Sequence, residues 1–305
     1  MPPRPAIAMG TIEWLLLLAL AAVWSTTFLF SKMALAELPP LSVVLGRLGF
    51  AALALAVAMR LAGQSVPRQG EVWRAFLGMG AINNAVPFSL LAWGQTHIAS
   101  GLAAILNATT PLFTIMLAHV ATEDEKITAG KLTGILLGLA GVAAMIGPDL
   151  IEQVGGDIAG ELACLGAACC YALAGLYGRR FRRLGLSPLV TATGQVTAAT
   201  LLLLPIVALA DRPWSLPDPP GPAVWAALVT AGLLCTALGY VLYFHILARA
   251  GATNLMLVTL MMPAGAVLLG ALVLGERLAF RQFLGLGLII LGLVAIDGRW
   301  RIVSP

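Results

Sequence analysis

Charged side chains are scarce in this sequence. Only 10% of its 305 residues are Asp, Glu, Lys or Arg, whereas 60% are hydrophobic, and the mean hydropathy is +0.94. A soluble domain carries roughly 25% charged residues. The chain therefore has too little charge to cover a water-facing surface of its size, and lipid is the expected surrounding for most of it.

Cysteine is also rare, and its placement excludes two classes of site. The four cysteines lie within apolar segments and form no CxxC pair; they are Cys164, Cys169, Cys170 and Cys235. This spacing is typical of small packing residues, and neither a disulfide framework nor a metal site is expected. We expect no cofactor.

Titratable groups are missing from the middle of the apolar segments. Carboxylates and histidines stand at or near segment ends, and no paired aspartates or Ser/His dyad lie at depth. An intramembrane enzyme is therefore disfavoured. A deep carboxylate is the usual carrier in proton exchange, so facilitated transport is favoured. Proton coupling through Glu161 or a histidine stays open.

Ten apolar runs are each long enough for a spanning helix of roughly 20 residues. They cover residues 12–35, 40–60, 72–95, 99–119, 129–147, 158–178, 187–210, 222–246, 252–274 and 281–297. Only short connections remain between them. The sequence thus predicts an all-α membrane protein of ten transmembrane helices, with no separate soluble domain.

Basic residues divide unevenly between the two sides that these helices define. Thirteen lysines and arginines fall on the side of Arg4, and three (Arg212, Arg277 and Arg281) fall on the other. Such a bias marks the cytoplasmic side and places both termini there. The densest run, GRRFRRLG at 178–185, is interpreted as an anchor in this cytoplasmic loop, and nucleic acid is excluded as a partner.

The chain repeats itself. EKITAGKLTGILLGLAG begins at Glu125, and ERLAFRQFLGLGLIILG begins at Glu276, so that Gly134 matches Gly285 and Gly141 matches Gly292 at an offset of 151 residues. Each half, 12–147 and 158–297, holds five helices. Because five is odd, the second copy enters the membrane from the opposite side, which is the inverted-repeat arrangement of alternating-access carriers.

Several motifs carry a resemblance to a known family. They include AAVWSTTF at 21–28, TTPLFTIML at 109–117, the Glu125–Val142 pattern ExxTxxKxxGxxLxxxGV and MMPAGAVLLGALVLGERL at 261–278. Each half resembles the EamA module of the drug/metabolite transporter superfamily. The chain is similar to bacterial inner-membrane exporters of aromatic and other amino acids and of methyl viologen. Two departures are Gln195, where an arginine matching Arg47 is expected, and Tyr171 near the place of Trp24.

Polar and aromatic residues counted to the helix centres give the candidate substrate site. Deep polar groups in a membrane are costly and mark pathways, and deep aromatic rings offer faces to an aromatic or cationic substrate. The candidates are Trp24, Ser25, Phe28, Asn83, Asn84, Phe88, Asn107, Thr110, Tyr171, Thr236, Tyr240 and Thr259. Each of them alone also suits helix packing. Trp93, Tyr243 and Phe244 are assigned to the interfacial belt.

Three prolines are predicted hinges. Pro111 and Pro263 occupy matching helices, and Pro87 frees the carbonyl of Asn83 from its helical partner. For Arg47 the favoured interpretation is a structural bond to helix-end carbonyls or snorkelling, although it suits a substrate carboxylate. The glycines of the fifth and tenth helices are assigned to packing.

Together these features predict an exporter of amino acids and related small amphipathic metabolites. Organic cations are possible further substrates, and the protein is expected as a monomer or weak homodimer in the bilayer. Two other transport functions stay open. A carrier of nucleotide sugars or phosphorylated metabolites requires several deep cations, and a proton-coupled drug or cation exporter requires a deep titratable group.

Overall fold

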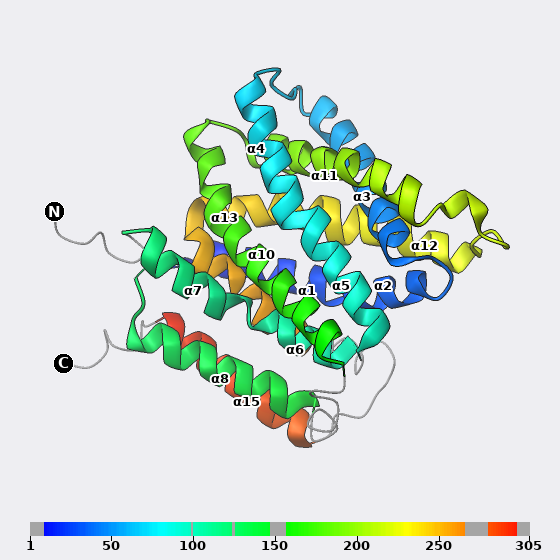
Figure 1. Cartoon of the computed structure of the whole chain (residues 1–305). Helices are drawn as coiled ribbons and strands as arrows, with labels where there is room; N and C mark the ends of the chain where they lie inside the picture. The colour runs from blue at the N-terminus through cyan, green and yellow to red at the C-terminus, as the bar shows by residue number, and fades with distance from the viewer. Residues whose placement is uncertain (1–8, 99, 124–125, 147–156, 266–279, 298–305) are drawn as a thin grey trace, which may run out of the picture.

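The computed structural model describes residues 9–98, 100–123, 126–146, 157–265 and 280–297. All regular structure in these residues is helical (Figure 1). Large apolar side chains such as Leu53, Leu61 and Leu209 are more than half exposed. An apolar exterior over a helical bundle is what a lipid surrounding requires.

The first half of the chain supplies five crossings. In order they are α1 (Thr11–Ser25) with α2 (Thr27–Leu35), α3 (Pro40–Leu61), α4 (Gly70–Gly80) with η1 (Ala81–Ala85) and α5 (Val86–His97), α6 (Ser100–Ala108) with α7 (Thr110–Ala121), and α8 (Ala129–Ile146). The predicted helices are all present, but three of these crossings are interrupted near their middle.

The second half repeats this order. It comprises α10 (Ile158–Arg183), α11 (Pro188–Ala210), α12 (Pro222–Thr230) with η3 (Ala231–Leu238) and α13 (Gly239–Met256), helical residues 258–265, and α15 (Phe280–Asp297), with a single turn η2 (Pro213–Ser215) between α11 and α12. The expected ninth helix, 252–274, begins within α13, and its residues 266–274 lie outside the described ones. Seven stretches are long and apolar enough to span a membrane, and two shorter apolar helices accompany them.

Local sequence explains where these helices begin and end. Pro40, Pro188 and Pro222 stand in first turns, where a missing N–H costs nothing. The chain leaves α3 at Gly63 and α10 at Gly185, both with positive φ. One expectation is wrong here: the basic run is not a loop, because Arg179, Arg180, Arg182 and Arg183 lie in the last turns of α10. The buried Phe181, whose ring stacks on that of Phe76, packs this helix against the bundle beyond its expected end at residue 178.

The two halves interlock. The helix α3 packs against α11, α10 packs against α5, and α1 packs against α13, so each contact joins one half to the other. The helices α8 and α15 lie side by side at one flank of the bundle (Figure 1). Most of the buried residues form one core shared by both halves.

Glycines make the α8 and α15 contact possible. A β-carbon at Gly134 would collide with the carbonyl oxygen of Gly292, and one at Gly141 would lie 2.7 Å from that of Gly285. Gly134 thus contacts Gly292, which is the repeat counterpart of Gly141, and Gly141 contacts Gly285, which is the counterpart of Gly134. The two helices run antiparallel. This exchange is the signature of a twofold relation between two copies of opposite orientation.

Candidate substrate-binding site

Interruptions of helical geometry gather near the middle of the bundle. The first crossing breaks at Thr26, the fourth at Thr109, and the ninth at Leu257. The third and eighth crossings instead contain π-helical segments, η1 and η3, at matching places in the two halves. Such segments are rare and are frequent at functional sites.

Pro87 accounts for part of the irregularity around η1. As expected from the sequence, the carbonyl oxygen of Asn83 has no helical partner at Pro87, and it accepts a 3.0 Å hydrogen bond from the hydroxyl of Tyr240. The Nδ2 atom of Asn84 donates a 2.8 Å bond to the same hydroxyl. One tyrosine thus joins the irregular turn of the first half to the second half.

A cavity lies between these interrupted helices. Its open volume, counting the solvent at its mouth, is about 800 Å³. Its walls come from α1, α2, α3, η1, α5, α6, α10 and α13 and from residues 258–265. It extends from the bundle centre towards the end at which α2 and α5 finish and α3 begins.

Eight of the predicted site residues line the cavity. They are Trp24, Phe28, Asn83, Phe88, Asn107, Tyr171, Tyr240 and Thr259. They come from both halves, so the fold brings together positions as much as 235 residues apart. Residues of the two halves that were predicted to lie at a similar depth in the membrane therefore line the same cavity.

The other four predicted residues lie beside the cavity and hold helices in place. The hydroxyl of Ser25 donates to the carbonyls of Ala21 and Met262, and Thr110 donates to the carbonyl of Asn107. Asn84 contacts Tyr240, and Thr236 accepts from Arg47. Their contacts are those of packing residues.

The three predicted hinge prolines differ in their surroundings. Pro87 stands two residues after the end of η1, in the first turn of α5, and Pro111 stands two residues after the break at Thr109. Pro263 lies within helical residues 258–265, six positions after the break at Leu257. Pro111 and Pro263 therefore match in sequence, but the breaks near them do not.

Aromatic rings form much of the wall. The rings of Trp24 and Tyr240 have centroids 6.1 Å apart and meet edge to face, and those of Phe88 and Tyr171 are 6.5 Å apart. Gly239 leaves room for the Trp24 indole, whose Nε1 donates a 2.8 Å bond to the carbonyl of Cys235. The rings are thus held in fixed positions around the hollow.

Two residues assigned to an interfacial belt are buried. The exposed fractions of Tyr243 and Phe244 are 1% and 4%, whereas Trp93 is exposed. The belt assignment of Tyr243 and Phe244 is wrong because α13 continues to a tight turn at Gly251, which puts both rings about two turns inside the bundle. Tyr243 also lines the cavity.

Arg47 is the main residue that sequence reasoning underrated. Its side chain is buried in the cavity wall, its Nε donates a 2.6 Å bond to Oγ1 of Thr236, and its guanidinium lies 4.3 Å from the centre of the Phe88 ring. The interpretation as a snorkelling residue is wrong, because the side chain is buried, and the expected structural bond is made to a hydroxyl of the other repeat instead of to helix-end carbonyls. Among the described residues, no carboxylate pairs with it.

Several buried polar atoms at the cavity have no partner within the described protein. They are Oγ1 of Thr27, Oδ1 of Asn83, Oε1 of Gln95, Oδ1 of Asn107 and the hydroxyl of Tyr243. Buried polar atoms are normally hydrogen-bonded, so such a group of exceptions indicates a place for a polar ligand or water. Gln95 escaped prediction because it stands at the end of its expected helix, 72–95, whereas Thr27 stands near the middle of its expected helix, 12–35, but was not among the predicted site residues.

The lining residues include no Asp, Glu, Lys or His within the part of the chain that the structure describes. Arg47 supplies their one full charge. The nearest matching position of the second half, Gln195, is buried and accepts a 3.1 Å bond from Nδ2 of Asn83. Because the position that matches Arg47 carries a neutral amide, the second repeat adds no second cation next to the described cavity wall.

The comparisons with known proteins agree with this architecture. The model of the EamA-like transporter family matches residues 11–147 and again residues 158–296. The chain belongs to the EamA-like transporter family. It is a multi-pass membrane protein of two inverted repeats, and the three relatives described below are named as transporters or exporters.

Three relatives are informative. The chain is 24% identical to the uncharacterized transporter YoaV of Bacillus subtilis over 91% of this chain and 94% of YoaV. It is 25% identical to the uncharacterized inner membrane transporter YedA of Escherichia coli K12, over 92% and 89%. It is also 26% identical to a probable terminal-alkyne amino-acid exporter of Streptantibioticus cattleyicolor, over 94% and 93%.

A solved structure shares the fold. A crystal structure of a protein aligns with a TM-score of 0.77 over 95% of this chain and 99% of the other, at 19% identity. At that identity the likeness concerns the fold alone.

Proposed function

We propose that this chain exports neutral amino acids, aromatic ones among them, across a bacterial inner membrane by alternating access. The observation that carries the proposal is the buried guanidinium of Arg47, which faces the cavity with no carboxylate partner among the described residues. A buried charge is costly unless it is paired. The carboxylate of a substrate is the counter-charge that this site lacks.

The geometry of Arg47 suits this role. Its Nε is engaged by Thr236, and the ring of Phe88 covers one face of the guanidinium. The two terminal nitrogens remain for a ligand. A guanidinium presents its N–H groups as a fork that matches both oxygens of a carboxylate.

An ammonium group has acceptors nearby. Oδ1 of Asn83, Oδ1 of Asn107 and Oε1 of Gln95 lack partners among the described residues and belong to the same cavity. An ammonium group donates three hydrogen bonds and accepts none, so uncharged oxygens satisfy it without adding a second fixed charge. One cation and several neutral acceptors are complementary to a zwitterion.

The apolar part of the wall suits the side chain of the substrate. The rings of Trp24, Phe88, Tyr171 and Tyr240 surround the hollow, and Met256 and Met262 add flexible apolar surface. Fixed rings favour an aromatic or large aliphatic side chain by burial and edge-to-face contact. The relative from Streptantibioticus cattleyicolor, named as a probable amino-acid exporter, supports the same substrate class.

The alternatives fit less well. A nucleotide sugar or phosphorylated metabolite carries two or more negative charges, and the described wall offers only Arg47 as a cation. An organic dication such as methyl viologen would be repelled by that arginine. Proton coupling lacks a carboxylate or histidine in the described wall, because Glu161 stands in the first turn of α10 and His97, His119 and His245 are exposed.

The bias of basic residues supports an orientation with both termini in the cytoplasm, so that export runs from the arginine-rich side. We also propose that the monomer is the working unit, because residues of one chain supply every group of the proposed site.

The test is efflux of labelled phenylalanine and leucine from proteoliposomes containing the purified protein, with and without an imposed pH gradient. We expect efflux that the gradient leaves unchanged. Phenethylamine, which lacks the carboxylate, should compete at least about tenfold more weakly than phenylalanine, the loss expected for one charged hydrogen-bonded pair. Equal competition by the two compounds would refute the role of Arg47, and efflux that follows the proton gradient would refute the facilitated mechanism.

A further inference from the structure

A second, smaller hollow lies at the arginine-rich end of the bundle. It is formed by α10, α11 and α13, and its wall includes Gly178, Arg179, Arg182, Thr191, Phe244 and Leu247. None of these residues belongs to the candidate substrate site. The hollow is located at the opposite end of the bundle from the mouth of the central cavity.

The repeat relates this hollow to the central cavity. Trp24 corresponds to Tyr171 at an offset of 147, Arg47 to Gln195 at 148, and Pro111 to Pro263 at 152. The offset of 147 relates Ser31 to Gly178, and the offset of 148 relates Val43 to Thr191. The offset of 152 relates Ala92 to Phe244 and Gln95 to Leu247. In each pair the first residue lines the central cavity and the second lines the second hollow. The second hollow is therefore the repeat counterpart of the outer half of the cavity.

One layer of rings separates the two spaces. Phe244 lines the second hollow, while Tyr243 and Tyr240 line the central cavity, and the centroid of the Phe244 ring is 5.0 Å from that of Tyr243 and 6.3 Å from that of Tyr240. In the first repeat, Leu91 and Ala92 stand at the positions of Tyr243 and Phe244. Smaller side chains leave one end of the pathway open, and larger rings fill the other.

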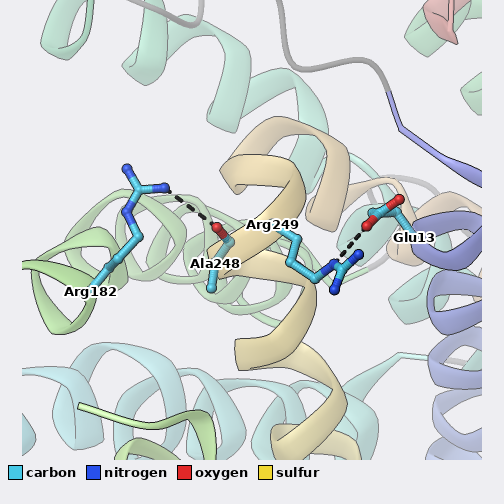
Figure 2. Close-up of polar contacts among 4 residues, drawn as sticks. All are labelled: Glu13, Arg182, Ala248 and Arg249. Atoms are coloured by element: carbon cyan, nitrogen blue, oxygen red, sulfur yellow. Dashed lines mark hydrogen bonds and ion pairs between the residues drawn. The ribbon is translucent and has the colours of Figure 1, made fainter. Parts of the chain in front are cut away.

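Arginines stand at the mouth of the second hollow. Nη1 of Arg182 donates a 3.4 Å bond to the carbonyl of Ala248, which is its one acceptor among the described residues (Figure 2). The side chain of Arg182 is exposed, so its remaining N–H groups are accessible to an anion. The surrounding wall is otherwise mostly apolar, as at the central cavity.

An ion pair closes the same end of the bundle. Nε of Arg249, two residues before the kink of α13 at Gly251, donates a 2.6 Å bond to Oε1 of Glu13 in the first turn of α1 (Figure 2). Gly251, at φ 82° and ψ 174°, then turns the chain back within a single residue. The part of α13 before this kink is thus fixed to the first repeat beside the hollow.

We propose that the second hollow is the entry vestibule for a substrate bearing a carboxylate, that Arg182 attracts this carboxylate, and that the Phe244 ring is the gate to the central cavity. The inference rests on the proposed function for its substrate class and direction. The position of the gate follows from the packing of the rings alone, and it is tested without any substrate.

The gate is tested by chemical access. In a variant whose four cysteines are replaced by alanine, a cysteine is introduced at Thr27, in the central cavity, and a membrane-impermeant maleimide is added from the arginine-rich side. Phe244→Ala should speed the labelling of this cysteine at least about tenfold, because removing a large ring opens the layer. Leu77→Ala, on the exposed surface of α4, is the matched control and should leave the rate unchanged. Equal labelling rates in both variants would refute the gate.

The vestibule is tested by transport kinetics from each side. Phenylalanine uptake is measured in vesicles of both orientations, which are distinguished by labelling a cysteine placed at the exposed Arg68. Arg182→Gln should raise KM about tenfold for substrate offered at the arginine-rich side and leave KM at the other side unchanged. The neighbouring Arg183→Gln, whose side chain is outside the hollow, should change neither.

The possible outcomes separate the two proposals. If the unmodified protein transports phenylalanine and Arg182→Gln acts like Arg183→Gln, the vestibule is refuted and the proposed function stands. If the effect of Arg182→Gln appears only in vesicles containing anionic phospholipid, the hollow binds a lipid headgroup and the vestibule is again refuted. If no amino acid is transported at all, the proposed function fails, while the labelling experiment still decides on the gate.

Discussion

Arg47 and Thr236 join the second helix of one repeat to the third helix of the other, through a 2.6 Å hydrogen bond from Nε to Oγ1. Thr236 in turn donates a 3.0 Å bond to the carbonyl of Ala231, five residues earlier, within the π-helical segment η3. The segment η3 therefore fixes the position of the Thr236 hydroxyl, and this hydroxyl in turn orients the Arg47 side chain. Arg47 is held in one orientation at the cavity wall.

The first prediction concerns this hydroxyl. Thr236→Val keeps the shape of the side chain but leaves Nε of Arg47 without its partner, and it should weaken phenylalanine binding about tenfold, as expected for a lost bond to a charged group. Thr236→Ser keeps the hydroxyl and should bind within about twofold of the unmodified protein. Equilibrium binding in detergent measures both. Equal affinities for the two variants would contradict the positioning role.

The second prediction concerns Tyr240. Tyr240→Phe removes the hydroxyl that contacts the carbonyl of Asn83 and Nδ2 of Asn84, so two buried groups lose a partner. We expect the free energy of unfolding to fall by roughly 1–3 kcal/mol. Tyr243→Phe is the control, because the Tyr243 hydroxyl has no partner among the described residues. Thermal unfolding in detergent should show a lower Tm for Tyr240→Phe than for Tyr243→Phe, and the reverse order would contradict the assignment.

The third prediction concerns the glycines between α8 and α15. Gly141→Leu introduces a side chain where even a β-carbon would lie 2.7 Å from the carbonyl oxygen of Gly285, so the helices must separate. The free energy of unfolding should fall by about 1–3 kcal/mol or more. At Gly287, on α15, no atom lies within 4 Å of an added β-carbon, and Gly287→Ala should leave Tm unchanged or raise it slightly. A stable Gly141→Leu variant would show that this contact is dispensable.

The fourth prediction concerns the turn at Gly251. Its φ of 82° and ψ of 174° belong to a region that is essentially restricted to glycine. Gly251→Ala should therefore lower the free energy of unfolding by roughly 1–3 kcal/mol. Gly63 has a φ of 67° and open space around it, and Gly63→Ala should cost only about 1 kcal/mol. The yield of folded protein and its Tm provide the comparison. A smaller loss at Gly251 than at Gly63 would contradict the strain argument.

Much of the fold was predictable because membrane helices must be long, apolar and bounded by charge or proline. The repeat then fixed the relation between the halves, since five crossings invert the second copy. The glycine pairs of the fifth and tenth helices were correctly assigned to packing, because small residues at regular spacing serve close helix contact in lipid.

The details of the site were less predictable, for physical reasons. A π-helical turn inserts one residue into the helical register, and apolar helices carry no periodic pattern from which that insertion could be detected. Pro87 was the one signal of it. Arg47 and Tyr243 were misjudged because burial there depends on helices from the opposite repeat, whose positions no local pattern contains.

The matching π-helical segments η1 and η3 also bear on the origin of the chain. Such a segment arises when one residue is inserted into a regular helix. Since η1 and η3 occupy the same helix of each repeat, the simplest history has a single insertion in an ancestral five-helix gene, before that gene was duplicated and fused. In that history the ancestor works as a pair of identical, oppositely oriented chains, and the presence of Arg47 in one repeat and Gln195 at the matching position of the other records how the two copies have since diverged.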